Sequence, residues 1–238
     1  MSPRRLNPSM RNALIEVAAQ LLASEGPKAL STRRVAAEAG TSTMAVYTYF
    51  GSMSELVREI VREGFARLQR FFDLVQPTGD AVADMALLGR VYRQNAVTNP
   101  HVYSVMFGGS SLAGFDLSEA DRQHGRYTLT RVIDYAHRCV AAGRFRPDDP
   151  VLAAHQMWLG VHGTVTLELG EYLIDPYDAD RCFEAQLVNL MIGAGDQPKE
   201  AASSVAVSGE RYAKSLGAEV GDRTDVGGEF GVPVSDEV

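Results

Sequence analysis

The stretch LSTRRVAAEAGTSTMAVYTYFGSMSEL, residues 30–56, decides the fold of the amino-terminal part of this 238-residue chain. Hydroxyl residues cap a first short helix, which Gly40 ends in the left-handed conformation that glycine tolerates. A tight turn over 41–43 follows, and a second short helix occupies 44–50. Two short helices joined by a glycine-containing turn of this length predict a helix-turn-helix over residues 31–50.

The side chains of this motif suit contact with a DNA duplex. In a helix-turn-helix the second helix enters the major groove, while the first helix crosses the phosphate backbone. Tyr47 lies on the helix face opposite Val46 and Phe50, so it is expected to face outward rather than into the core. The alternative is a small helical hairpin without a nucleic-acid partner. The residues able to bind phosphates or base edges are Thr32, Ser42 and Thr43 through hydroxyls, Arg33 and Arg34 at the groove rim, and Tyr47 and Tyr49 through phenol rings.

Helical spacing of apolar residues continues along nearly the whole chain, and no segment shows the period of two that is typical of a strand. Asn7-Pro8 is a helix start signal, and Ser52 with Glu55 is a capping box that opens a long helix to about residue 75. We predict nine helices in an all-α fold, with a three-helix head and a larger helical body. The predicted domains are 8–68 for the head, 76–195 for the body and 196–238 for a tail.

The composition changes after Gly195. Residues 196–238 are rich in glycine, serine and acidic side chains and poor in large apolar ones, so they are predicted to form a disordered acidic tail. A marginal helix over 199–216 is the alternative. Removal of 197–238 is then expected to leave the dimer and its DNA binding intact.

Charge is distributed unevenly along the chain, whose formal net charge is −7. Residues 1–70 hold ten lysines and arginines against six acidic residues, and residues 71–196 hold nine against sixteen. A basic amino-terminal third on an acidic body favours a polyanionic partner for that third alone. The alternative is that a local excess of four charges has no function.

Several classes of protein are excluded or disfavoured. No stretch approaches the ~18 apolar residues of a membrane span, and residues 1–11 lack the apolar run of a secretory signal. Cys139 and Cys182 cannot form a disulfide framework. We therefore expect a cytoplasmic protein that does not act at a membrane.

Catalytic and metal-binding patterns are also missing from the sequence. There is no Gly-x-Ser-x-Gly, no His-Glu-x-x-His, no phosphate-binding loop and no set of ligands at metal spacing. We expect no enzyme activity, no cofactor and no metal. The alternatives are an all-helical enzyme built on His155 and His162, and a helical adaptor that binds proteins through its head.

Residues 30–56 resemble the DNA-binding segment of the TetR family of bacterial transcriptional repressors, through Ala39-Gly40, Tyr47, Phe50 and Leu56. The resemblance covers roughly residues 8–68. It implies a three-helix head and an all-helical body for ligand binding and dimerisation. It also implies a homodimer on palindromic double-stranded DNA. By this resemblance Arg33, Thr43, Met44, Ala45 and Tyr47 face bases, and Thr32, Ser42 and Tyr49 face phosphates.

One position departs from the family pattern. The family usually has lysine where this chain has Met53, so one phosphate contact is missing. Arg58, or the pair Arg4-Arg5, are the candidates to replace it.

A second, shorter resemblance lies in the body. Trp158-x-x-x-His162-Gly163 is similar to the Trp-His-Gly signature of one carboxy-terminal subgroup of the family. The last two helices of the family usually form a four-helix bundle across a twofold axis, here about 150–172 and 178–193. Gly160 and Gly163 would permit close helix approach in that bundle, or they serve packing within one subunit.

His155, Trp158 and His162 form a stripe on one helix face, which is more typical of a buried or pocket-lining surface than of a metal site. Since the family counterpart of the apolar segment 101–107 tends to close the ligand cavity, a small-molecule effector is expected to lie here. The function predicted is a ligand-responsive repressor, with an activator of the same fold as the alternative. The predicted ligand-contacting residues are Tyr103, Met106, Phe107, Trp158, Leu159 and His162.

Overall fold

The computed structural model describes residues 7–107, 112, 114, 115 and 117–216. Within these ranges it contains ten α-helices and no strand, which confirms the all-α prediction and adds one helix to the nine expected. The helices are α1 Pro8–Glu25, α2 Thr32–Glu38, α3 Thr43–Phe50, α4 Met53–Asp73, α5 Ala81–Thr98, α6 Pro100–Met106, α7 Glu119–Ala141, α8 Pro150–Leu169, α9 Ala179–Ala194 and α10 Pro198–Arg211.

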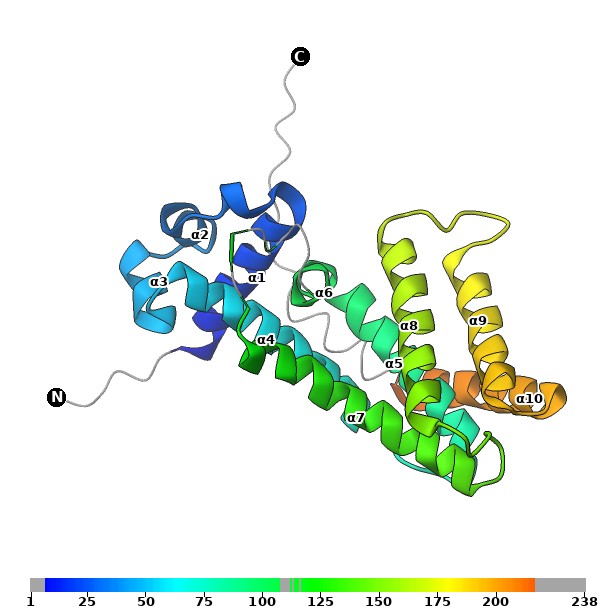
Figure 1. Cartoon of the computed structure of the whole chain (residues 1–238). Helices are drawn as coiled ribbons and strands as arrows, with labels where there is room; N and C mark the ends of the chain where they lie inside the picture. Colours follow the sequence, from blue (N-terminus) through cyan, green and yellow to red (C-terminus); the bar gives the residue numbers. More distant parts are fainter. Residues whose placement is uncertain (1–6, 108–111, 113, 116, 217–238) are drawn as a thin grey trace, which may run out of the picture.

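Helices α1 to α3 form the head at one end of the molecule (Figure 1). Their first turns are capped as predicted. Asn7, Ser31 and Ser42 each accept a backbone N–H, at 3.0, 3.3 and 3.3 Å. Gly40 follows α2 and Gly51 follows α3, with φ angles of +65° and +73°. Residues other than glycine rarely adopt such angles. Local signals therefore account for the boundaries of the short helices.

Helix α4 runs from the head into the body, and α7 lies alongside it (Figure 1). The capping box predicted at the start of α4 is only half formed. Ser52 Oγ accepts the N–H of Glu55 at 3.1 Å, but the Glu55 carboxylate accepts from Arg58 and Arg62 instead, at 3.0 and 2.7 Å. Two arginines on the next turns compete for this carboxylate, since charged donors make stronger hydrogen bonds than a backbone amide.

The short helix α6 packs against both α1 and α4. A Cβ atom at Gly64 would lie 3.0 Å from Met106 and 3.1 Å from Val102, so glycine lets α4 approach α6 closely. Met106 and Val102 are almost completely buried. Helix α6 therefore connects the head to the interior of the body.

Helices α8 and α9 stand side by side (Figure 1). A Cβ atom at Gly160 would lie 3.0 Å from Leu190 and 2.8 Å from Gln186, so this glycine serves close packing of α8 on α9 within one chain. Gly163 differs, because a Cβ atom there would meet nothing within 4 Å.

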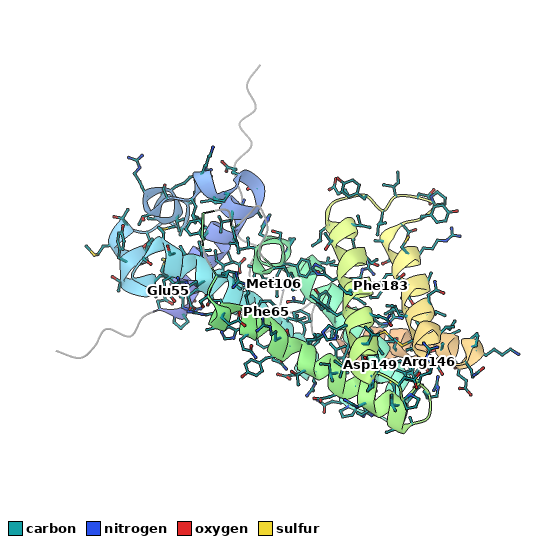
Figure 2. The ribbon with its side chains drawn as sticks, viewed as in Figure 1. Glu55, Phe65, Met106, Arg146, Asp149 and Phe183 are labelled. Carbon is teal, nitrogen blue, oxygen red and sulfur yellow. The ribbon has the colours of Figure 1, made fainter. Side chains whose placement is uncertain are left out.

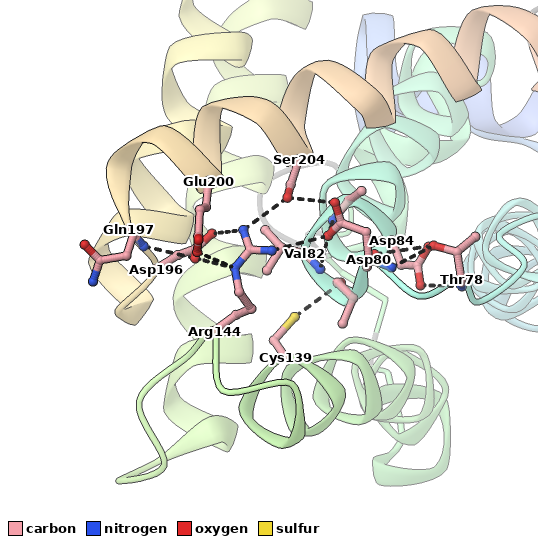
Figure 3. A network of polar contacts seen from close by, with 12 residues as sticks. Thr78, Asp80, Val82, Asp84, Cys139, Arg144, Asp196, Gln197, Glu200 and Ser204 are labelled. Carbon is pink, nitrogen blue, oxygen red and sulfur yellow. Dashed lines mark hydrogen bonds and ion pairs between the residues drawn. The ribbon is translucent and has the colours of Figure 1, made fainter.

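The predicted disorder of 196–238 is wrong for its first part, and the alternative of a helix near 199–216 is confirmed, since residues 198–211 form α10 against α5 and α9. Small residues such as Ala201 give this helix a narrow buried face. Distant polar partners fix it in place (Figure 3): Ser204 Oγ donates to Asp80 at 2.8 Å, and Arg144 Nε pairs with Asp196 at 2.6 Å. Residues 217–238 lie outside the described residues.

The last turn of α10 also holds the loop that follows α4. The buried Asp84 carboxylate accepts from Thr78 N at 2.7 Å, Arg138 at 2.9 Å and Arg211 at 2.6 Å. Burial alone would raise the pKa of Asp84, but these donors outweigh burial and lower it. Arg211 also donates to the Gln76 carbonyl at 3.0 Å, so α10 ties down the distal end of α4.

Candidate functional site

The turn between α2 and α3 gives α3 one buried and one exposed side. Val46 and Phe50 are 1% and 6% exposed and pack into the head. On the opposite side Thr43 is exposed, Met44 is 70% exposed and Tyr47 is 50% exposed. The outward orientation expected for Tyr47 is therefore confirmed.

Residues of α2 border this exposed face. Thr32 Oγ1 lies 3.5 Å from Tyr47 Oη, so the first turn of α2 is adjacent to α3. Arg33 is exposed and forms no ion pair with any described residue. Ser42 is exposed and caps α3, and Ala45 is half-buried on its first turn. Seven of the eight predicted residues thus lie on or beside one outward face, whereas their contact with DNA stays a prediction.

Tyr49 is the exception. Its hydroxyl accepts the N–H of Asn7 at 2.9 Å and donates to the Asn7 carbonyl at 3.2 Å. The phenolic proton is therefore used inside the head, where it fixes the start of α1. This geometry does not support the predicted phosphate contact of Tyr49.

Two arginines considered for the DNA surface are also engaged within the protein. Arg34 pairs with Glu25 at 2.6 Å and Glu38 at 2.8 Å, and its hydrogen bond lowers the pKa of Glu25. Arg58 pairs with Glu55 and lies 3.7 Å from Asp121 of α7. Arg58 therefore faces the body, and this geometry does not support it as the replacement for the phosphate contact missing at position 53. Arg4 and Arg5 lie outside the described residues.

A cavity of about 470 Å³ lies among α4, α6, α7 and α8. Phe65 of α4 and Met106 of α6, both labelled in Figure 2, contribute to its wall. The phenyl ring of Phe65 approaches the α7 backbone closely, because a Cβ atom at Gly125 would lie 2.8 Å from it. The lining residues are Val61, Phe65, Met106, Phe107, Leu112, Phe115, Leu117, Asp121, Arg122, Gly125, Arg126 and Trp158.

The predicted ligand residues divide into three groups. Met106, Phe107 and Trp158 line the cavity, as expected. The prediction for Leu159 is wrong, because its side chain is 59% exposed. Neighbouring residues on a helix point about 100° apart, so Leu159 points away from the cavity that Trp158 lines. The sequence did not predict the lining residues of α4 and α7. An apolar α4 residue such as Phe65 is as compatible with a filled core as with a cavity wall. Gly125 in the middle of α7 was the one sequence signal of a close approach at this place.

Tyr103 and His162 lie directly behind this wall. The rings of Phe107 and His162 are 4.5 Å apart between centroids. His162 Nδ1 lies 2.9 Å from Tyr92 Oη and 2.7 Å from Tyr103 Oη, and the two hydroxyls are 3.0 Å apart. Burial lowers the pKa of His162 and raises that of Tyr103 to about 12, so this network is uncharged at neutral pH.

An ion-pair cluster connects α4 with the start of α7 beside the cavity. Asp121 is buried, caps α7 with Ser118, and pairs with Arg62 at 3.1 Å. Burial alone would raise the pKa of Asp121, but the hydrogen bonds from Ser118 and the charge of Arg62 outweigh it and lower the pKa. The same carboxylate thus belongs to the cavity wall and to the contact between α4 and α7.

An apolar strip runs along the outer side of α8. Leu152, Leu159 and Leu167 are 53%, 59% and 47% exposed. Their spacing places them on one helix face, with the open position of Gly163 between them. Exposed leucines that recur on one face are typical of an interface rather than of a solvated surface.

Other candidate chemistry is weak in the part of the chain that the structure describes. No group of three or more His, Cys, Asp or Glu is placed to hold a metal ion there, and none of its helices is apolar and long enough to span a membrane. His155 Nδ1 bonds to the Val151 carbonyl of its own helix at 2.7 Å. Cys139 is buried, and burial raises the pKa of its thiol to about 12.

Two family models match the chain. Residues 14–60 match the model described as bacterial regulatory proteins, tetR family, and residues 85–190 match a tetracyclin repressor-like carboxy-terminal domain. Together they cover more than half of the 238 residues. The first range contains the outward face of α3, and the second contains part of the cavity.

Known relatives agree with these models. The HTH-type transcriptional regulator Mb1846 of Mycobacterium bovis is 27% identical over 209 residues, covering 73% of this chain and 87% of the relative. The HTH-type transcriptional repressor KstR2 of Mycolicibacterium smegmatis is 27% identical over 146 residues, covering 59% and 69%. The TetR family regulator PfmR from Thermus thermophilus has the same fold, with a TM-score of 0.62 at 19% identity over 77% of this chain and 99% of its own. The chain therefore belongs to the TetR family of DNA-binding transcriptional regulators.

Proposed function

We propose that the chain is a homodimeric repressor that a small molecule releases from a palindromic operator. The observation that carries the proposal is the place of α4 in the cavity wall. Val61 and Phe65 line the cavity, and the same helix begins directly after α3. A ligand among α4, α6, α7 and α8 changes what α4 packs against, so it favours one orientation of the head over another.

A second contact route supports the coupling. Met106 lines the cavity and packs against Gly64 of α4, while its helix α6 packs against α1 of the head. A bound molecule therefore touches two elements that reach the head. A coupling free energy of ~1–3 kcal/mol between effector and operator is enough for regulation.

The proposed DNA contacts follow from the outward face. Helix α3 enters the major groove, where a helix fits and each base pair presents a distinct pattern. Tyr49 is left out because its hydroxyl is held by Asn7. We assign base contacts to Arg33, Thr43, Met44, Ala45 and Tyr47, and phosphate contacts to Thr32 and Ser42.

Dimerisation is assigned to the outer side of α8 and to α9. The exposed leucines of α8 are covered when two copies meet there, and Gly163 gives room for close approach. Two copies present two heads, which read two half-sites of a symmetric operator. We place this complex in the cytoplasm, where the DNA of a bacterial cell lies.

Selection of duplexes from a random pool by the purified chain tests the DNA-binding part. We expect enrichment of an inverted repeat. With roughly 6–10 phosphate contacts per dimer, affinity for the enriched duplex should fall about 10³- to 10⁵-fold between ~50 and 200 mM salt. Fluorescence anisotropy at several salt concentrations measures the slope. Enrichment of no motif, or a salt-independent affinity, contradicts the proposal.

Leu159→Glu tests the dimer. Its side chain is 59% exposed in one chain, so the substitution leaves the subunit folded but places a charge in the proposed interface. We expect a monomer in light scattering and loss of binding to the inverted repeat. Tyr127→Glu on α7, where the tyrosine is 66% exposed, is the matched control and should stay dimeric. If the Leu159→Glu chain is still a dimer, the assignment of α8 to the dimer interface is contradicted.

A further inference from the structure

The lining of the cavity among α4, α6, α7 and α8 combines aromatic rings with a few charged groups. The rings are those of Phe65, Phe107, Phe115 and Trp158. The polar lining groups all come from one short stretch of α7, the first two turns that contain Asp121, Arg122 and Arg126. A molecule that fills this cavity therefore meets aromatic rings and, where α7 borders the cavity, charged groups.

The charged groups of α7 at the cavity differ in how they are paired. Asp121 is neutralised within the protein, because it accepts from Ser118 N at 2.9 Å, from Ser118 Oγ at 2.6 Å and from Arg62 at 3.1 Å. Arg122 forms no ion pair with any described residue. Among the described residues Arg126 pairs with the exposed Glu119 and with Gln123, and an exposed ion pair of this kind is weak. Among the described lining residues, the arginines of α7 are thus the charged groups that the protein leaves unpaired or weakly paired.

The setting makes these arginines unusual. Residues 71–196 carry nine lysines and arginines against sixteen acidic residues. Two of these nine lie four residues apart on α7, where i and i+4 side chains share one face, and both border the cavity. A body of negative net charge repels anions at long range, so an anion binds here only through local cations.

We propose that the effector of this regulator is an organic carboxylate with an aromatic or aliphatic body, and that Arg122 and Arg126 bind its carboxylate. This rests on the proposed function, in which the cavity is the effector site. Guanidinium groups fit the planar carboxylate with paired charge-assisted hydrogen bonds. The ligand body then packs against Phe65 and Trp158, and its carboxylate takes the place of Glu119 beside Arg126.

Matched probe pairs test the charge requirement. Decanoate with decanamide, and 4-phenylbutanoate with 4-phenylbutanamide, differ within each pair only in the charged group. Trp158 is the only tryptophan of the chain and lines the cavity, so its fluorescence reports binding of all four probes. At pH 7 and low salt we expect Kd to be at least about tenfold lower for each carboxylate than for its amide, since hydrogen bonds to charged groups are the stronger.

The variant Arg122→Gln/Arg126→Gln should abolish this difference while the Kd of each amide stays the same. The unchanged amide affinity shows that the cavity is intact. Lys199→Gln on α10 removes an exposed charge far from the lining residues, and it should keep the full carboxylate preference.

Three outcomes overturn the assignment in distinguishable ways. Equal Kd values for carboxylate and amide in the unchanged chain refute the anionic effector but keep the cavity as a ligand site. A carboxylate preference that persists in the double variant refutes the role of the two arginines. No binding of any probe at millimolar concentration refutes the cavity as effector site and with it the ligand response. None of the three outcomes bears on operator binding, which is measured separately and tests the DNA-binding part of the proposed function by itself.

Discussion

Replacing Tyr47 by alanine lowers affinity for the selected operator by roughly 10²- to 10⁴-fold. A direct base contact contributes ~1–3 kcal/mol to discrimination, and the dimer makes each contact twice. The ring is 50% exposed, and the hydrogen bond that its hydroxyl makes with Thr32 is long at 3.5 Å. Its loss therefore leaves the head folded. Fluorescence anisotropy on the operator and on a scrambled duplex measures the effect, which should be much smaller on the scrambled duplex.

Tyr127→Ala and Tyr49→Phe are the controls for this result. Tyr127 is exposed on α7, away from the head, and its removal should change neither affinity nor melting temperature. Tyr49→Phe breaks the bonds to Asn7, so it should lower the stability of the head. If Tyr47→Ala binds the operator normally, the outward face of α3 is not the base-reading surface.

The head was predictable because its signals are local. Ser31, Ser42 and Gly40 act within three or four residues of their own positions, where helix caps and turns are decided. The periodicity of α3 likewise placed Tyr47 outside and Val46 inside. Which hydroxyl bonds to which neighbour was not predictable, since Tyr49 meets Asn7 across 42 residues of chain.

The cavity was predictable only in part, because a cavity is formed by helices that are distant in sequence. Trp158 stood out as a single large aromatic residue, and it lines the cavity. Phe65 stands at the same helical spacing as the core residues of α4, so periodicity cannot tell a cavity wall from a filled core. The arginines of α7 carry no local pattern that differs from a solvated helix face.

The segment of α10 was predicted to be disordered because composition counts large apolar side chains. Composition does not show how closely small side chains pack against other helices. Ala201, Ser204 and Ser208 are small, yet all three are buried. Ser204 reaches Asp80 across 124 residues, and Arg90 reaches Ser208 across 118. Contacts of this separation leave no trace in a window of the sequence, so the segment resembled a disordered tail.

Ending the chain at residue 196 therefore lowers the melting temperature. The deletion removes α10, exposes the surface that Ala201 and Val205 cover, and takes Arg211 away from the buried carboxylate of Asp84. Hydrogen bonds to charged groups contribute about 1.5–3 kcal/mol each, and the deletion breaks two of them, from Arg211 to Asp84 and from Ser204 to Asp80. For a chain of this size each kcal/mol lowers the melting temperature by about 2–4 °C, so a fall of about 10 °C is expected.

A chain that ends at Leu216 keeps every described contact of α10 and is the matched control for differential scanning calorimetry.

The variant Arg211→Met isolates the ion pair with Asp84, and its effect on stability depends on pH in a defined direction. Because the folded pKa of Asp84 is lowered, the pairing stabilises the fold above the ordinary carboxyl pKa near ~4 and is lost as pH falls through the lowered value. The difference between Arg211→Met and the unchanged residue should thus be full at pH 7 and small in strong acid. Equal melting temperatures for the chains ending at 196 and 216 would show that α10 adds nothing to stability. The hydrogen bonds that Tyr135 and Arg138 of α7 donate to the Val75 and Thr78 carbonyls would then be enough to hold the segment after α4.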